Sequence, residues 1–436
     1  MTRAYGARGA GTGGRASVTS EAFPRTMADF GPSGGAYPEC AHVQFPGGCG
    51  WSSSADAGEA PASLMMDYET LCATAAARAF EERWTTPEWE GFLAHVGRCV
   101  ERGEGDWTQI VSEVGALEGA TAVRRVRDFD PSLVEAEFLL AGEGEPVVFE
   151  DGGRDWKRWR MEDFSSVIGS TLIRCNDRAP ARRSEEGPKQ RTHQLPFDMF
   201  VEYVRNREGE SGSGSLIGQF ERDHVPFYAN GMQAFSDPVT GEELSRAFPH
   251  PYFVSSCDQT EGLVRSVMQQ LSASLRVDGD AASNIEKMVS KSLDKVFCGP
   301  RFTITRLHFD SHDAHGYLGQ VEGRKLFVFF PPSDASKLGV IPTENSHARV
   351  DPLCPDLSRF PEFRDARPRV CVLSPGEVVL NPRGWWHYAV ALDSSVTVMR
   401  NFFNARTNLE ALVRMLLTTT HERSRQSGGA GPRSRG

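Results

Sequence analysis

The sequence lacks the cysteine patterns that build disulfide frameworks and zinc fingers. Its nine cysteines are an odd number, and no two of them have CxxC spacing. It also lacks an apolar stretch approaching the ~20 residues that cross a bilayer. No charged segment followed by an apolar one marks a secretory signal. We therefore expect reduced thiols in a cytoplasmic or nuclear protein with no membrane span.

Motifs of several large enzyme classes are missing as well. The chain contains no Walker loop, no dinucleotide-binding fingerprint and no Gly-x-Ser-x-Gly elbow. Lysine and arginine number 48 against 58 acidic residues, and the net charge of −10 gives no direct sign of nucleic-acid binding. Aromatic residues make up 10% of the chain, so a large core can form and wholesale disorder is excluded.

Composition and hydrophobic spacing divide the chain into five parts. Residues 1–60 are rich in Gly, Ala and Ser and are expected to be a disordered tail. Apolar residues recur at helical spacing over 61–120, which predicts a helical subdomain. Residues 121–408 carry short apolar runs between Gly and Pro and form the main domain. A last helix is predicted over 409–422, followed by a basic disordered tail over 423–436.

The first twenty residues leave a second interpretation of the N-terminal tail. They contain Arg3, Arg8 and Arg15 and no acidic residue, a composition that resembles an organelle transit peptide. A disordered tail accounts for the same composition, and the sequence does not distinguish a cleaved segment from a retained one.

The main domain is predicted to be mainly β. Its apolar runs are short and are separated by turn residues, which is typical of a sandwich or barrel. Strands are predicted over residues 146–149, 171–173, 302–309, 325–330, 370–373, 377–380, 388–392 and 396–403. One helix is predicted over 283–296, while 176–194, 206–216 and 311–320 have the composition of polar loops.

The sharpest chemical signal is the pair His308 and Asp310. On a strand, positions i and i+2 point to the same face, so the imidazole and the carboxylate lie side by side and can hold one metal ion. Two histidines and one carboxylate are the ligand set of non-haem Fe(II) oxygenases, which keeps positions open for substrate and oxygen. An HxD triplet alone is common, so a second histidine must complete the set.

Four histidines compete for the third ligand position. His312 shares strand parity with His308, but a span of about 13 Å between them is too long for one ion. His315 and His347 lie in segments predicted to be polar loops. His387 follows a Pro-Arg-Gly-Trp-Trp segment, where a turn delivers it into the next strand. This context favours His387.

Four ordered segments resemble motifs of the JmjC-type 2-oxoglutarate dioxygenases. They are GPRFTITRLHFD at 299–310, GRKLFVFFPP at 323–332, GEVVLNPRGWWH at 376–387 and NFF at 401–403. The upstream stretch 124–159 is similar to the family's entry module, so the resemblance covers roughly residues 120–410. It implies the family's fold, a mainly β double-stranded β-helix (cupin or jelly roll) with flanking α-helices. Here that fold would be accompanied by the N-terminal helical subdomain and the disordered tails.

The resemblance assigns the metal ligands by position. His308, Asp310 and His387 match the family's iron ligands. Fe(II) is therefore the implied metal, 2-oxoglutarate the cosubstrate and O₂ the oxidant, with no catalytic residue beyond the metal site. The segment after Asp310 lacks the asparagine often found there, and its His312 and His315 either line the site or are solvated.

The resemblance also implies four contacts to the cosubstrate. Lys325, 17 residues after the HxD histidine as in the JmjC-only hydroxylases, matches the lysine that pairs with the distal carboxylate. Thr305 matches the residue that hydrogen-bonds the same carboxylate. Asn401 matches a polar residue near the iron, and Tyr203 a tyrosine at the distal carboxylate. Arg324 is the rival cation, because strand parity does not separate it from Lys325.

The reaction implied by the resemblance is insertion of oxygen coupled to decarboxylation of 2-oxoglutarate to succinate. Hydroxylation of a protein side chain is the first expectation. If the hydroxylated carbon is an N-methyl group, the product loses formaldehyde, so an N-methyl-lysine or N-methyl-arginine (histone) demethylase is the second. A cupin that binds a partner without activity is the third, and the complete ligand set with Lys325 argues against it.

Charge and aromatic residues suggest the kind of substrate. The acidic total charge, with Asp313 and Glu322 near the active strands, favours a basic protein or peptide segment. An acidic surface kept for solubility explains the same charge, and distant charges are screened by salt. We expect Tyr317, Trp385 and Trp386 to form the floor of the site or to support it.

The predicted C-terminal helix carries a stripe of leucines after Asn408, its expected N-cap. Leu409, Leu412, Leu416 and Leu417 recur at helical spacing on one face. The stripe packs either against helices of the same chain or against a second copy in a homodimer.

Overall fold

The computed structural model describes most of the chain from residue 117 onward. The described residues are 117, 119–177, 192–208, 226–275, 279–341, 344–353 and 355–428. The predicted tail at 1–60 and nearly all of the predicted helical subdomain at 61–120 lie outside them. The chain divides into two units, Met1–Ser54 and Ala55–Gly436, and every described residue belongs to the second.

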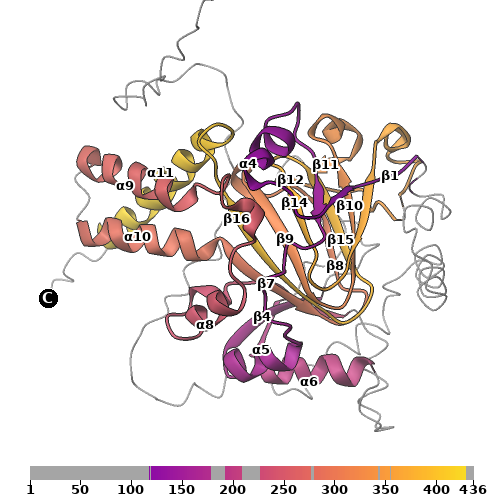
Figure 1. Cartoon of the computed structure of the whole chain (residues 1–436), viewed down its shortest axis with the longest axis horizontal. Coiled ribbons are helices and arrows are strands. Elements are labelled where there is room, and N and C mark those ends of the chain that lie inside the picture. Colours follow the sequence, from indigo (N-terminus) through magenta and orange to yellow (C-terminus); the bar gives the residue numbers. More distant parts are fainter. Residues whose placement is uncertain are drawn as a thin grey trace, which may run out of the picture. The chain divides into compact units, whose positions relative to one another are not determined.

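The strands form two large sheets (Figure 1). The strands of the seven-stranded sheet are β1 (Thr121–Ala122), β8 (Ile304–His308), β10 (Lys325–Phe330), β11 (Val340–Ile341), β12 (Glu344–Ala348), β13 (Arg369–Leu373) and β15 (Trp386–Ala391). Those of the nine-stranded sheet are β2 (Arg124–Val126), β3 (Val147–Phe149), β4 (Leu172–Asp177), β5 (Thr192–Pro196), β6 (Phe227–Met232), β7 (Asp294–Gly299), β9 (His315–Glu322), β14 (Val378–Asn381) and β16 (Ser395–Phe402). The strand orders are β1-β13-β10-β15-β8-β12-β11 and β2-β3-β14-β9-β16-β7-β6-β4-β5.

Side chains from the two sheets meet in an apolar core between them. On β10, Phe327 and Phe329 belong to this inner core, whereas the alternate residues Leu326, Val328 and Phe330 lie in a cluster on the outer face. The nine-stranded sheet contributes Val148, Leu318, Val379 and Met399 to the inner core. Two facing sheets of short strands with helices around them form a jelly roll, which confirms the predicted fold class of the main domain.

Helices flank the two sheets (Figure 1). They are α4 (Pro131–Val134), α5 (Met161–Ile168), α6 (Phe197–Glu208), α8 (Thr240–Ala247), α9 (Thr260–Leu275), α10 (Gly279–Ser292) and α11 (Leu409–Gly428). Helices α5, α6 and α8 share one apolar cluster with strands β4 to β7, and α9, α10 and α11 pack on one another in a second cluster. In the described part of the chain, none of the helices has the length and apolar character needed to span a membrane.

The apolar face of α11 is covered within the chain. Leu412 and Leu416 are fully buried in the cluster shared with α9 and α10, and Leu409 and Leu417 lie at its edge. The stripe thus packs against helices of the same chain, which is the first of the two predicted alternatives. The buried leucines are therefore not exposed for contact with a second copy. The helix also continues to Gly428, six residues past the predicted end, because Arg, Ser and Gln are tolerated in helices.

The segment predicted as a polar loop at 311–320 is the largest difference between expectation and fold. Most of it belongs to β9, a central strand of the nine-stranded sheet whose first six residues are buried. Glycines interrupt its apolar pattern, and the packing requires them: a Cβ on Gly319 would lie 2.0 Å from the ring of Trp156. Strand β6 and helices α5, α6, α8 and α9 likewise have no counterpart among the predicted elements.

Candidate metal centre

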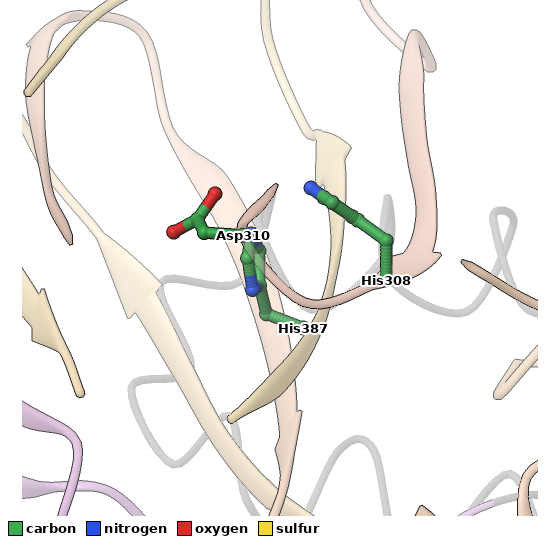
Figure 2. A group of neighbouring side chains, drawn as sticks. All are labelled: His308, Asp310 and His387. Atoms are coloured by element: carbon green, nitrogen blue, oxygen red, sulfur yellow. The ribbon is translucent and has the colours of Figure 1, made fainter. Parts of the chain in front are cut away.

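His308, Asp310 and His387 converge at one place between the two sheets (Figure 2). His308 ends β8, and His387 lies opposite it on β15, so the two imidazoles share a face. Asp310 follows just after β8 in extended backbone and is buried. One ligand atom from each residue lies within 4.8 Å of the others, and the two imidazole centroids are 4.2 Å apart. This donor set and geometry fit a facial site for a divalent transition metal.

A backbone carbonyl group sets the tautomer of His308. Its Nδ1 lies 2.8 Å from the carbonyl oxygen of Arg306, which accepts and never donates, so Nδ1 carries the proton and Nε2 is the ligand atom. Nδ1 of His387 lies 3.3 Å from the carbonyl oxygen of Trp385 and 3.2 Å from Nδ2 of Asn381. Asn381 therefore lies beside two of the three convergent side chains, because the same amide nitrogen donates to Asp310.

The carboxylate of Asp310 is held from the opposite sheet. Asn381 on β14 donates from Nδ2 to Oδ2 of Asp310 over 3.3 Å. Gly316 on β9 pairs with both Asn381 and Asn401, and a Cβ there would lie 2.9 Å from the same carboxylate oxygen and 3.5 Å from Nδ2 of Asn401. Glycine at 316 therefore lets the sheets approach at the metal ligands, and it places Asn401 beside them.

His315, one of the four competing histidines, is engaged away from the metal ligands. Its Nδ1 accepts a hydrogen bond of 3.0 Å from the backbone N–H of Arg383, so its Nε2 donates to Oγ1 of Thr407, which lies 2.7 Å away. Burial lowers the pKa of His315 to about 3, so the ring is neutral. It is a structural residue on β9 and does not lie in a solvated loop.

His347 and His312 both lie near the metal ligands. His347 is on β12, opposite His308, and the two ring centroids are 5.7 Å apart. His312 lies in the turn Ser311–Asp313 with a φ of 60°, so the strand does not continue to it. The group of three convergent ligands contains His387 and not His312.

The other end of the site is a buried lysine. Nζ of Lys325 donates to Oγ1 of Thr397 over 2.8 Å and to the hydroxyl of Tyr228 over 3.3 Å. Thr305 lies beside them, with its hydroxyl 3.5 Å from that of Tyr228. Lys325 is 3% exposed, and burial lowers its pKa to about 7. The ammonium group therefore sits among neutral hydroxyls, with no carboxylate of the described residues paired to it.

The rival cation Arg324 is placed elsewhere. Its guanidinium makes a two-pronged ion pair with Asp393, with distances of 2.7 Å from Nε to Oδ2 and 3.0 Å from Nη2 to Oδ1. Its side chain is 29% exposed, and the pairing with Asp393 raises its pKa. Arg324 is thus neutralised near the surface, and Lys325 is the cation that faces the interior.

The tyrosine beside Lys325 is Tyr228 and not Tyr203. Tyr203 lies on α6 in the cluster with α5 and α8, and its hydroxyl accepts from the backbone N–H of Phe227 over 3.0 Å. Tyr228 is the next residue, on β6, and is buried with a raised pKa. Tyr203 was expected at the same place as Lys325, and the structure instead places Tyr228 there.

The residues expected to attract a basic ligand are engaged within the chain. Asp313 forms an ion pair with Arg383, and a carboxylate oxygen of Glu322 accepts from the backbone N–H of Met161 over 2.6 Å. The expectation of a basic substrate therefore rests on the net charge alone. Neither Asp313 nor Glu322 now supports this expectation.

Of the three residues expected to form an aromatic floor, Trp386 and Tyr317 lie in clusters on the outer faces of the sheets, and Trp385 lies in the inner core. The ring of Trp386 packs edge-on against Phe309, between the two HxD ligands, with centroids 4.9 Å apart. Trp385 contributes its carbonyl oxygen to His387. Tyr317 belongs to the cluster on the far face of the nine-stranded sheet. The aromatic residues therefore stiffen the strands that carry the ligands.

Comparison with known proteins agrees with this geometry. Residues 131–408, more than half of the chain, match the family model described as a cupin-like domain. The protein belongs to the cupin-like family. Its JmjC-type motifs agree with the relatives: JmjC domain-containing protein D of Dictyostelium discoideum is 32% identical over 126 residues, 28% of this chain and 27% of the relative. The predicted resemblance to JmjC-type cupins is confirmed.

Two further relatives of this cupin-like protein carry names that refer to proteins. HSPB1-associated protein 1 of Rattus norvegicus is 38% identical over 308 residues, which cover 68% of this chain and 57% of the relative. Lysine-specific demethylase 8 of Xenopus tropicalis is 37% identical over 102 residues, 23% of each chain. The chain spans somewhat more than half the length of the HSPB1-associated proteins that it matches.

Proposed function

We propose that this protein is an Fe(II)- and 2-oxoglutarate-dependent oxygenase that hydroxylates a protein side chain. One observation carries the proposal: the buried ammonium group of Lys325 has no counter-ion among the described residues and lies between the same two sheets as three convergent metal ligands. Burying an unpaired charge is costly. A ligand that brings a carboxylate to Lys325 and metal-binding oxygens to the other end satisfies both groups at once.

The register of the strands supports a ligand of this shape. Lys325 pairs with Ala391 and Phe329 pairs with His387, so the lysine and the metal ligand are separated by about 13 Å along the strands. Ala389 lies between them on the same face of β15 and has a small side chain. A dicarboxylic 2-oxo acid can reach inward from one group to the other, with both side chains extending toward it.

Each residue of the site then has a defined task. His308, His387 and Asp310 hold the metal, while Lys325 binds the distal carboxylate of the cosubstrate with a charge-assisted hydrogen bond. When bound, Fe(II) and 2-oxoglutarate supply the oxidation chemistry, in which O₂ is consumed, succinate and CO₂ form and the substrate gains a hydroxyl group. The apolar core around Phe327 and Phe329 keeps bulk water from the site.

A protein substrate is supported by the relatives. The names of two relatives refer to association with HSPB1 and to demethylation of lysine, and both concern proteins. The similarity to lysine-specific demethylase 8 covers 23% of the chain and favours demethylation of an N-methyl group as the second candidate function. The complete ligand set and the unpaired Lys325 argue against a cupin without activity, because such a scaffold has no need of a buried cation.

Anaerobic titration of Fe(II) and 2-oxoglutarate, followed by exposure to O₂ with candidate peptides, tests the proposal. We expect stoichiometric binding of both and succinate release that increases with the right peptide. A mass gain of one oxygen atom in the peptide indicates hydroxylation, and loss of a methyl group with formaldehyde indicates demethylation. The absence of 2-oxoglutarate binding in the metal-loaded protein would contradict the proposal.

A further inference from the structure

A second lysine lies at the metal end of the site and has no task in the proposed function. Lys295 is the second residue of β7 and pairs with Met399 on β16. Phe297, two residues further on, faces the same side, and its ring centroid lies 5.9 Å from Nζ of Lys325. Lys295 therefore also faces the interior, about 7 Å further along the strand from Phe297.

The ammonium group of Lys295 is only partly satisfied by the protein. It donates to Oδ1 of Asn401 over 3.1 Å, its one hydrogen bond within the described residues. An ammonium group has three N–H donors, so two of them are left for a ligand. The side chain is half-buried, and its stem passes Gly231, where an added Cβ would lie 3.7 Å from Cδ of the lysine.

The charges around Lys295 do not pair with it directly. Asp310 and Asp294 both attract the ammonium group, but neither forms an ion pair with it. Asp294 is paired with Arg400 at 2.9 Å, and Asp310 is one of the metal ligands. Burial and then the charge of Lys295 lower the pKa of His312. Burial also lowers the pKa of Lys295, so a bound anion would stabilise its charged form.

The turn that brings His312 to this place is held in an uncommon backbone conformation. His312 and Asp313 have φ values of 60° and 50°, in the left-handed region that residues other than glycine rarely adopt. Arg383 pairs with the Asp313 carboxylate, and Nδ2 of Asn408 donates to the Asp313 carbonyl over 3.0 Å. These contacts hold the turn Ser311–Asp313, which ends the extended backbone after Asp310 and contains His312.

We propose that Lys295, positioned by Asn401, binds a carboxylate beside the metal, separate from the carboxylate at Lys325. This inference rests on the proposed function and gives the site a second anion-binding position. Two sources can supply the carboxylate: the one next to the keto group of 2-oxoglutarate, or an acidic side chain of the substrate. An acidic substrate group is the opposite of the basic ligand that the net charge suggests.

Calorimetry with three oxo acids on the Mn(II)-loaded protein tests whether the cosubstrate supplies the carboxylate. They are 2-oxoglutarate, 4-oxopentanoate, which lacks the carboxylate next to the keto group, and 2-oxopentanoate, which lacks the distal one. If the cosubstrate supplies the carboxylate, Lys295→Met weakens binding of 2-oxoglutarate and 2-oxopentanoate by roughly ten- to a hundredfold and leaves 4-oxopentanoate unchanged. Lys325→Met instead weakens 2-oxoglutarate and 4-oxopentanoate, Lys295→Arg retains part of the affinity, and the exposed Lys291→Met serves as control.

If the substrate supplies the carboxylate, Lys295→Met binds all three oxo acids as the wild type does. N-acetyl-aspartate, added with and without 2-oxoglutarate, then shows Mn(II)-enhanced proton relaxation in the wild type and in Lys295→Arg but not in Lys295→Met. The inference is overturned if Lys295→Met matches Lys291→Met in both measurements, or if it weakens all three oxo acids equally. A wild type that binds none of the oxo acids contradicts the proposed function instead, and the N-acetyl-aspartate measurement still decides the role of Lys295.

Discussion

At the scale of single residues, the site works by placing protons and charges where a ligand needs them. The carbonyl group of Arg306 fixes the proton of His308 on Nδ1, so Nε2 of this ring is oriented to bind a metal. Lys325 lies among hydroxyl groups in the buried interior, and burial lowers its pKa to about 7. The buried ammonium group costs stability, and a bound carboxylate would offset that cost.

Asp310→Ala is expected to lower Mn(II) affinity by more than roughly a hundredfold, because it removes the anionic ligand of the site. Succinate release should fall to background as well. Free Mn(II) is measured by electron paramagnetic resonance, with Asp155→Ala as a control whose side chain is 68% exposed. Retained metal binding and succinate release in Asp310→Ala would show that the three convergent side chains are not the ligands.

Lys325→Met is expected to stabilise the protein and to abolish binding of 2-oxoglutarate. The folded pKa of about 7 is below the ordinary 10.5, so the folded state holds fewer protons between these values and is disfavoured as the pH falls through them. The variant should therefore unfold with a free energy roughly 2–4 kcal/mol larger at pH 7, and the gain should shrink toward pH 10.5. Urea denaturation at several pH values measures this, and Arg324→Ala should leave 2-oxoglutarate binding nearly unchanged.

The same pKa predicts how the affinity for 2-oxoglutarate depends on pH. A carboxylate binds the charged ammonium, so the affinity should fall by about tenfold for each pH unit above 7, and binding at pH 8 should take up a proton. Calorimetry in buffers of different ionisation enthalpy detects that proton. An affinity that is constant from pH 7 to pH 9 would mean that Lys325 is charged throughout this range without the ligand.

At the scale of elements, glycines decide how strands and neighbouring side chains approach one another. Gly316 on β9 lies against the carboxylate of Asp310, and Gly319 on the same strand lies against the ring of Trp156. The indole N–H of Trp156 also donates to the carbonyl of Pro249 over 2.7 Å, so this ring is fixed at both ends. Strand β9 therefore uses glycine for close packing where a sequence pattern suggests a loop.

Gly319→Ala should destabilise the protein by about 3 kcal/mol, because the new Cβ overlaps the Trp156 ring. Gly262→Ala is the matched control: this glycine lies in α9 with nothing within 4 Å of an added Cβ, and the change should stabilise by about 0.5–1 kcal/mol. Thermal or urea unfolding compares the two. Equal effects of the two substitutions would contradict the role assigned to Gly319.

At the scale of the whole described unit, the helices α9, α10 and α11 are tied to the sheets by charge as well as by apolar contact. Arg400 on β16 is buried and binds Asp258, just before α9, at 2.8 Å, and Asp294 at the start of β7 at 2.9 Å. The stripe on α11 packs onto the same group of helices. The C-terminal helix is thus packed onto the unit that carries the three convergent side chains, and Asn408, just before the helix, donates to the carbonyl of Asp313 in the turn after Asp310.

Leu412→Asp should destabilise the fold by roughly 3 kcal/mol or more, since it buries a carboxylate in the cluster with α9. The exposed Thr418→Asp on the same helix should change the free energy of unfolding by less than about 0.5 kcal/mol. Urea unfolding measures both, and sedimentation shows whether the oligomeric state changes. A Leu412→Asp variant of unchanged stability that no longer forms a dimer would place the stripe in an interface between copies.

The sequence by itself determined the fold family and the chemistry of the ligands. Local order carries this information: the HxD triplet, the Trp-Trp-His turn and the strand with Lys325 are contiguous segments whose residue types suit one ion and one carboxylate. The strand itself was predicted over 325–330, but not which of its residues face the site, because both of its faces are apolar.

Only the tertiary structure decided which of two candidate cations, and which of two candidate tyrosines, lies at the interior end of the site. Arg324 pairs with Asp393 near the surface, whereas Lys325 points between the sheets and contacts Tyr228. The leucine stripe of α11 is covered by helices α9 and α10, which precede β7 in the chain. Lys295 reaches the metal end because β7 pairs with β16, a contact between residues about a hundred positions apart. Such contacts depend on register between distant strands, which no local pattern specifies.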